Sequence, residues 1–200
     1  FRALERALAL GPEDYSSLSL LASFLTQEGR GGVVIELTAP YMRFSEPDPD
    51  IGLVRALAQA RLGRFEEALA TLDVVAAVDP ELATVEVHRG TVLLMAGRRE
   101  AARQAYRAAL ETAPDTVAAL TALAVMTTEE GRVDAARDYW RRAGAVEARA
   151  WGRLLALAMR LWESGDRRSA RPLLELFVEA APSSIYADEV VRVRRLLGFD

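Results

Sequence analysis

The chain has 200 residues, with 25 basic and 29 acidic side chains, one histidine and no cysteine, for a net charge of −4. The lack of cysteine excludes a disulfide scaffold, a thiolate metal site and a cysteine nucleophile, and a single histidine excludes a multi-histidine metal site. A negative net charge argues against a dedicated nucleic-acid-binding protein, because contacts to phosphates need a basic surface. No apolar run reaches the roughly 18 residues of a membrane-spanning helix. Every basic residue is arginine and alanine is abundant, which suggests a GC-rich bacterial genome.

An interval of 34 residues runs through the chain. Glycines recur at this interval, and alanines and prolines recur with them. The positions are Gly29, Gly63, Gly97, Gly131 and Gly165, then Ala68, Ala102, Ala136 and Ala170, and finally Pro12, Pro80, Pro114 and Pro182. Such regular spacing predicts a repeat architecture in which each unit is one supersecondary motif.

The segment at 83–116 indicates what one unit contains. Residues 84–95 predict a first helix, which Gly97 ends because glycine readily adopts the left-handed conformation of a helix C-terminus. A second helix follows, and Pro114 closes the unit because proline cannot continue it. The second helix carries one apolar stripe at i, i+4 and i+7, formed by Ala102, Tyr106 and Ala109.

This unit resembles the tetratricopeptide repeat (TPR). That family places small residues where its two helices cross, a glycine after the first helix, a large apolar residue and an alanine on the second, and a proline at the end. Six residues here match those positions: Gly90, Gly97, Ala102, Tyr106, Ala109 and Pro114. The resemblance covers essentially the whole chain and implies an all-α fold, a right-handed α-solenoid of antiparallel helix pairs.

The 34-residue frame predicts the boundaries of the segments. They are the second helix of an incomplete repeat at 1–14, a divergent repeat at 15–48, repeats at 49–82, 83–116, 117–150 and 151–184, and a capping helix at 185–200. A solenoid needs such a cap to seal its last apolar face. Because the chain begins in mid-repeat, we expect further sequence upstream of Phe1, and the compartment and oligomeric state stay open.

The repeat at 15–48 departs from the family pattern in its second half. Gly31 and Gly32 stand where a helix should begin, and Pro40 would fall inside that helix. Since proline breaks helices, the sequence predicts a kinked or shortened helix. The alternative is that residues 29–50 form an irregularity specific to a partner.

The repeat at 49–82 departs at three positions that the family fills with large apolar residues. Gly52, Arg55 and Gln59 occupy them. A different apolar stripe is present, formed by Ile51, Val54, Ala58 and Leu62. This second stripe predicts that the helix is rotated relative to the family register.

Few residues are candidates for catalysis. His88 is the single histidine, and no motif supplies a nucleophile and an orienting acid beside it. The glycine-rich stretch at 29–32 lacks the Lys-Ser/Thr ending of a phosphate-binding loop. Acidic residues interleave with the arginines of the second helices, which favours a solvated outer face over an RNA-binding surface. We therefore predict no enzyme activity, no cofactor and no metal site.

In TPR proteins the first helices line the concave surface, and the resemblance places a largely apolar set of residues there. We predict that the partner-binding groove comprises Leu53, Leu57, Val87, Thr91, Met95, Val125, Leu155, Met159 and Trp162. Chaperone-binding TPR domains grip a C-terminal carboxylate with lysine, asparagine and arginine side chains. The corresponding positions here hold Ser19, Ser23, Val54, Thr84 and His88. Capture of a chaperone tail is therefore not expected, and an apolar groove suits an amphipathic helix or an apolar extended segment.

The leading hypothesis is a non-enzymatic scaffold that binds a protein or peptide partner, with no nucleic acid and no membrane span in this segment. Two alternatives remain: the C-terminal repeat region of a larger enzyme, or a fixed subunit of a multiprotein complex. The identity of the partner does not follow from the sequence.

Overall fold

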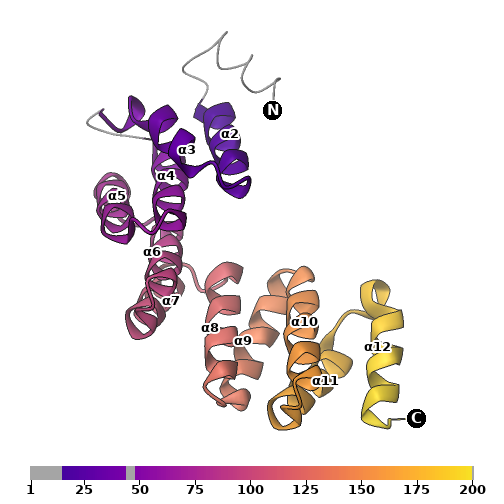
Figure 1. Cartoon of the computed structure of the whole chain (residues 1–200). Helices are drawn as coiled ribbons and strands as arrows, with labels where there is room; N and C mark the ends of the chain where they lie inside the picture. The colour runs from indigo at the N-terminus through magenta and orange to yellow at the C-terminus, as the bar shows by residue number, and fades with distance from the viewer. Residues whose placement is uncertain (1–14, 44–47, 200) are drawn as a thin grey trace. The chain divides into compact units, whose positions relative to one another are not determined.

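The computed structural model describes residues 15–43 and 48–199. Within these ranges every regular element is helical and no strand occurs, so the prediction of an all-α stack of helix pairs is confirmed. The chain divides into two compact units, residues 1–112 and 113–200 (Figure 1). The helix expected at 1–14 lies outside the described residues.

The described part of the first unit contains three helix pairs. Its elements are α2 (Tyr15–Gln27), α3 (Gly31–Thr38), the 3₁₀ turn η1 (Tyr41–Arg43), α4 (Pro49–Arg61), α5 (Phe65–Val78), α6 (Ala83–Met95) and α7 (Arg99–Thr112). The first helices of the pairs contact one another, α2 against α4 and α4 against α6. Each also packs on its own second helix, so apolar side chains are buried both within and between the pairs.

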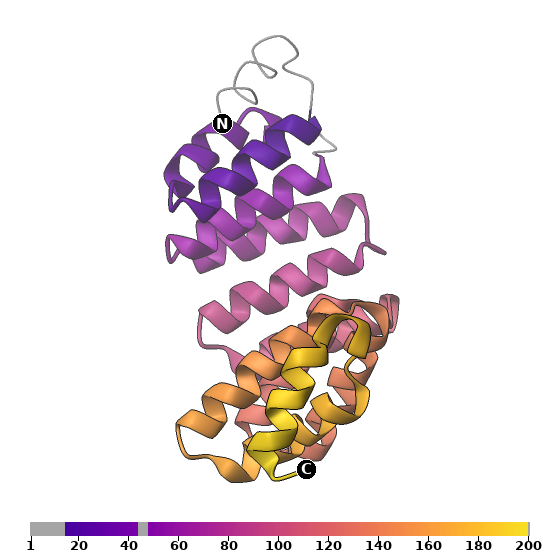
Figure 2. The same cartoon turned by 90° about the vertical axis from the view of Figure 1, so that its right-hand side faces the viewer.

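The second unit contains two helix pairs and a last helix. Its elements are α8 (Val117–Glu129), α9 (Val133–Val146), α10 (Arg149–Glu163), α11 (Arg167–Ala180) and α12 (Ser183–Leu197). Within this unit, α8, α10 and α12 stand side by side in one row, which Figure 2 shows from the α12 end. Trp140, Leu154 and Phe177 belong to its buried core cluster, which Val193 and Leu197 of α12 complete.

The glycines of the 34-residue interval end the first helices. All five have a positive φ, between 73° and 92°, a region that other residues rarely adopt. After Gly97, the N–H of Arg98 donates to the carbonyl of Leu93 at 2.8 Å, the bond that closes a Schellman motif. The predicted role of these glycines in ending helices is confirmed.

Gly90 on α6 has a different role from the helix-ending glycines, because it leaves space for a side chain of the second helix. A Cβ at Gly90 would lie 2.7 Å from Cε1 of Tyr106, so the space that Gly90 leaves is filled by that ring. The Tyr106 side chain is almost completely buried, and its hydroxyl lies 3.2 Å from Oγ1 of Thr91. The aromatic position of the second helix thus packs directly onto the backbone of the first.

Helix α3 is short. It has eight residues, whereas α5 and α7 have 14 each. It ends at Thr38, two residues before Pro40, because proline has no N–H to donate to the carbonyl of Glu36 and so cannot continue the helix. The described residues therefore show a shortened helix, one of the two forms predicted for this repeat, while a role for 29–50 in partner binding stays a prediction.

Helix α4 buries residues of both sets: Ile51 and Ala58 of the predicted stripe, and Gly52 and Gln59 at the family positions. Ala56 and Leu53 pack toward α5, and Ala58 and Val54 pack toward α2 and α3. The helix is buried on two sides because it lies between the neighbouring pairs. Leu62, the last member of the predicted stripe, is 47% exposed and lies beyond the helix end.

Candidate functional site

In the first unit, the predicted groove residues lie on α4 and α6. Met95 is 43% exposed, and Leu57, Val87 and Thr91 are half-buried. The Thr91 hydroxyl donates to the carbonyl of Val87 at 2.9 Å, so its polar group is already satisfied. The accessible part of this set is consequently apolar.

Leu53 was predicted to face the groove, and this is wrong. Its side chain is only 6% exposed and belongs to the core cluster that also contains Leu72 and Val85. The reason is the contact of α4 with α6, whose Val85 and Val92 belong to the same cluster.

In the second unit, the predicted residues are Val125 on α8 and Leu155, Met159 and Trp162 on α10. All four are half-buried and pack against the edge of the core cluster. The guanidinium of Arg167 lies 4.0 Å from the centroid of the Trp162 ring, a cation–π contact. The same guanidinium donates a hydrogen bond to the carbonyl of Trp162. One face of the indole is therefore already covered.

A cavity of about 410 Å³ opens between α10 and α12. Leu155 and Met159 form one wall. The other wall consists of Glu189, Arg192, Val193, Arg195 and Leu196 from α12. The volume is within the range of about 300–1,000 Å³ that is usual for binding pockets.

The α12 wall was missed by the sequence analysis, which treated this helix only as a seal. Glu189, Arg192 and Leu196 are spaced i, i+3 and i+7, so they form a second stripe beside the buried Val193 and Leu197. That spacing was the available signal. The stripe mixes charged and apolar residues, so a search for apolar periodicity passes over it.

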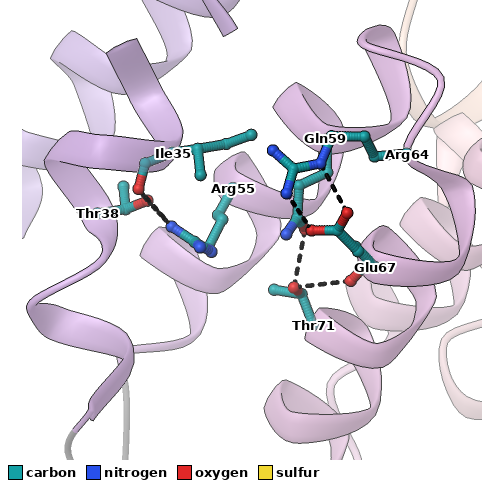
Figure 3. A network of polar contacts seen from close by, with 7 residues as sticks. All are labelled: Ile35, Thr38, Arg55, Gln59, Arg64, Glu67 and Thr71. Carbon is teal, nitrogen blue, oxygen red and sulfur yellow. Dashed lines mark hydrogen bonds and ion pairs between the residues drawn. The ribbon is translucent and has the colours of Figure 1, made fainter. Parts of the chain in front are cut away.

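The polar groups of α4 hold the short helix α3 in place. The Arg55 guanidinium donates to the carbonyl of Ile35 at 2.5 Å and to Oγ1 of Thr38 at 2.9 Å (Figure 3). Burial, and secondly the charge of Arg64, lowers the pKa of Arg55. These bonds explain why a cation is tolerated where the family places an apolar residue.

Gln59 makes a second buried polar contact on the other side of α4. The Thr71 hydroxyl of α5 donates to Oε1 of Gln59 at 2.8 Å (Figure 3). Nearby, Arg64 and Glu67 form an exposed ion pair, and the hydrogen bond from Arg64 lowers the pKa of Glu67. The bond between Gln59 and Thr71 joins α4 to α5, and the pair of Arg64 and Glu67 lies at the start of α5, so both contacts have a structural role.

The single histidine shows no catalytic arrangement. Nδ1 of His88 lies 2.8 Å from the carbonyl of Thr84 on its own helix, so this nitrogen carries a proton that it donates. In residues 15–43 and 48–199, no three histidine, aspartate or glutamate side chains come together as a metal site would require. No helix in the same ranges is long and apolar enough to cross a membrane.

Many arginines of the second helices are engaged with neighbouring acids or carbonyls. Arg98 pairs with Glu66 of α5, while Arg137 and Arg141 both approach Glu179 of α11. Arg142 donates to the carbonyl of Pro114 at 3.0 Å. These contacts agree with the interleaved charges of the sequence.

Comparisons with known proteins agree with the helix-pair architecture. Residues 88–152 match the family model of the tetratricopeptide repeat. The structure is similar to that of a thermophilic TPR protein from Thermus thermophilus, with 26% sequence identity over 72% of this chain and 79% of that chain, and a TM-score of 0.65. None of the curated proteins matches the sequence.

Two further solved structures share the fold at lower identity. One is MamA, with 19% identity over 73% of this chain and 85% of that chain, and a TM-score of 0.55. The other is the APC/C hetero-tetramer Cut9–Hcn1, with 14% identity over 98% of this chain but 39% of that chain, and a TM-score of 0.63. Residues 88–152 therefore match tetratricopeptide repeats, and the fold of the chain is similar to that of a TPR protein.

Proposed function

We propose that this chain is a non-enzymatic scaffold that binds an apolar or amphipathic segment of a protein partner on the faces of its first helices. A repeat scaffold for protein interaction is the general role of the TPR fold. The proposal adds where this chain makes the contact: on α6 in the first unit and on α10 in the second.

The observation that carries the proposal is the row of Leu155 and Met159 on α10, which opens into the 410 Å³ cavity. Apolar side chains that remain accessible to solvent in a concave part of the surface are typical of binding sites. Val87 and Met95 provide a smaller accessible row on α6. A short peptide that uses such a surface is expected to bind with micromolar affinity, about −8 kcal/mol.

The test is a double charge substitution with a matched control. Met95→Glu with Met159→Glu places one carboxylate on each proposed face, and we expect the captured partner to be lost because burying an unpaired charge is costly. The control is Val74→Glu with Val146→Glu, on the second helices α5 and α9. Those valines are 45% and 50% exposed, close to the 43% of Met95, whereas Met159 is half-buried. The control therefore adds the same charge and matches the exposure of Met95.

Tagged versions of the original chain and both variants are compared by affinity capture and quantitative mass spectrometry, after circular dichroism has shown that all three are helical. A partner captured by the original chain and the control but not by the methionine variant supports the proposal. Equal capture by all three contradicts it.

The two alternative functions, part of a larger enzyme and a fixed subunit of a complex, lead to different expected results. If these repeats are part of a larger enzyme, the coding sequence upstream of Phe1 contains a catalytic domain in the same reading frame. If the chain is a fixed subunit of a complex, it elutes from native extract at the size of that complex whether or not the methionines are substituted. A partner lost only in the methionine variant distinguishes our proposal from both.

A further inference from the structure

We propose that the cavity between α10 and α12 selects an acidic amphipathic helix, whose apolar side chains enter the cavity while its carboxylates bind Arg192 and Arg195. The inference rests on the proposed binding function and names the chemistry of the partner at the site in the second unit.

The apolar part of the cavity comes from both helices. Leu155 and Met159 are one turn apart on α10, and Val193 and Leu196 face them from α12. At about 410 Å³ the space is well above the roughly 150 Å³ cavity that accommodates a benzene-sized group, so it has room for more than one aliphatic side chain. Leu196 is still 38% exposed, so this wall has apolar surface left to cover.

The charges around the cavity are mainly positive. Arg192 and Arg195 line it, and Glu189 is the one acid among the lining residues. Over whole helices, α10 has three arginines and one acid, and α12 has three arginines and two acids. This excess is local, because the chain as a whole has a net charge of −4.

Arg192 and Arg195 also differ from the arginines of α9 and α11 in their ion pairing. Within residues 15–43 and 48–199, neither the Arg192 nor the Arg195 guanidinium makes an ion pair, and both side chains are exposed. Arg137, Arg141 and Arg171 of the same unit all pair with glutamates. The unpaired positive charges therefore lie at the mouth of the apolar cavity.

A helix is the partner shape that fits these walls. The α10 wall repeats at i and i+4, and the α12 stripe repeats at i, i+3 and i+7, which are the spacings of one helix face. Helices that lie in apolar grooves present anchors at these same spacings. Acidic residues beside the anchors would meet the planar guanidinium groups, which bind carboxylates with two parallel hydrogen bonds. A basic helix would meet two like charges and only Glu189 as a partner.

The experiment uses three synthetic peptides of 15 residues, the length of α10. All three carry leucines at helical anchor spacing and differ only in the flanking residues, which are glutamate, glutamine or lysine. Binding is followed by NMR of the protein labelled with ¹³C at the methionine methyl groups. The chain has four methionines, so the spectrum is simple. Met159 reports on the cavity, Met95 reports on the first unit, and Met126, which is 1% exposed, serves as a buried reference.

We expect the glutamate peptide to shift the Met159 signal and to bind about fivefold or more tightly than the lysine peptide at low salt, since two exposed ion pairs each contribute modestly. Arg192→Glu with Arg195→Glu should reverse this preference. The control, Arg107→Glu with Arg168→Glu, makes the same change of net charge at exposed positions outside the lining set and should leave the preference unchanged.

Several results would overturn the inference and leave the proposed function standing. Equal binding of the three peptides at Met159 would show that the cavity does not select charge, and a shift of Met95 alone would place binding in the first unit. A Met159 shift that depends on protein concentration without peptide would identify a second copy as the occupant. If anionic phospholipid vesicles shift the Met159 signal and the glutamate peptide does not, the binding partner is a lipid surface. No shift at Met95 or Met159 with any peptide would count against both proposals.

Discussion

Gly144, near the end of α9, offers a test in which local and tertiary effects have opposite signs. Helix propensity alone would make Gly144→Ala stabilising by about 1 kcal/mol. In the structure, a Cβ at this position would lie 2.2 Å from Cε2 of Trp151 and 2.5 Å from its Cζ2 and Nε1. The indole is 4% exposed and packed into the core cluster of the second unit, so it has little room to move.

Overpacking a core generally costs about 1–3 kcal/mol. A contact of 2.2 Å places this change in the upper part of that range, about 2–3 kcal/mol. After subtraction of the propensity gain of about 1 kcal/mol, we expect Gly144→Ala to lower the free energy of unfolding by roughly 1–2 kcal/mol. The assay is urea unfolding followed by tryptophan fluorescence, because all three tryptophans lie in residues 113–200 and report on this unit. With a typical m-value of about 2 kcal/mol per molar urea, the midpoint should fall by about 0.5–1 M.

A matched control and a rescue make the result decisive. Gly32→Ala on α3 is the control, because no heavy atom lies within 4 Å of its added Cβ, and far-UV circular dichroism should show an unchanged or higher midpoint. In a Trp151→Leu background the clash is absent, so Gly144→Ala should no longer be destabilising. A midpoint that rises on Gly144→Ala in the original chain would refute the tight packing of Gly144 against Trp151.

Two other predictions concern polar groups. Arg55→Leu should lower stability by about 1–2 kcal/mol, because charged hydrogen bonds to α3 are lost, and hydrogen exchange of the α3 amides should accelerate. Arg64→Leu, at an exposed ion pair, should leave that exchange unchanged. Asp166 caps α11, and hydrogen bonds from Ser169 lower the pKa of its carboxyl. Its contribution is therefore present above its unfolded pKa and lost as the pH falls through the lower folded value. Asp166→Ala should reduce stability at neutral pH and weaken the acid dependence measured by urea midpoints from neutral pH to pH 3; an unaltered acid dependence would contradict this role.

The sequence was sufficient to predict the helix pairs and where their first helices end. These features are local: a glycine at each 34-residue interval adopts the left-handed conformation wherever it stands, and apolar stripes of helical period need only a neighbouring helix to cover them. The short α3 could also be predicted, since Pro40 has no N–H to donate to the next helical hydrogen bond.

The accessible surface of the candidate site could be predicted only in part. Met95 is exposed as the family pattern implied, whereas Leu53 is buried because α4 is covered from two sides. Arg55 and Gln59 depart from the family pattern, and each has a polar partner from another helix. Such partners are separated from them by 20 and 12 residues, so no local pattern reveals them.

The sequence by itself determined the repeating unit of this protein, because helix propensity, glycine turns and apolar period all act within a few residues along the chain. Only the tertiary structure decided that α12 forms a wall of a cavity as well as a seal, and that Arg192 and Arg195 line this cavity without an ion pair to any residue of 15–43 or 48–199. The reason is that burial and charge pairing depend on which helices become neighbours, and neighbouring surfaces here come from segments that lie tens of residues apart.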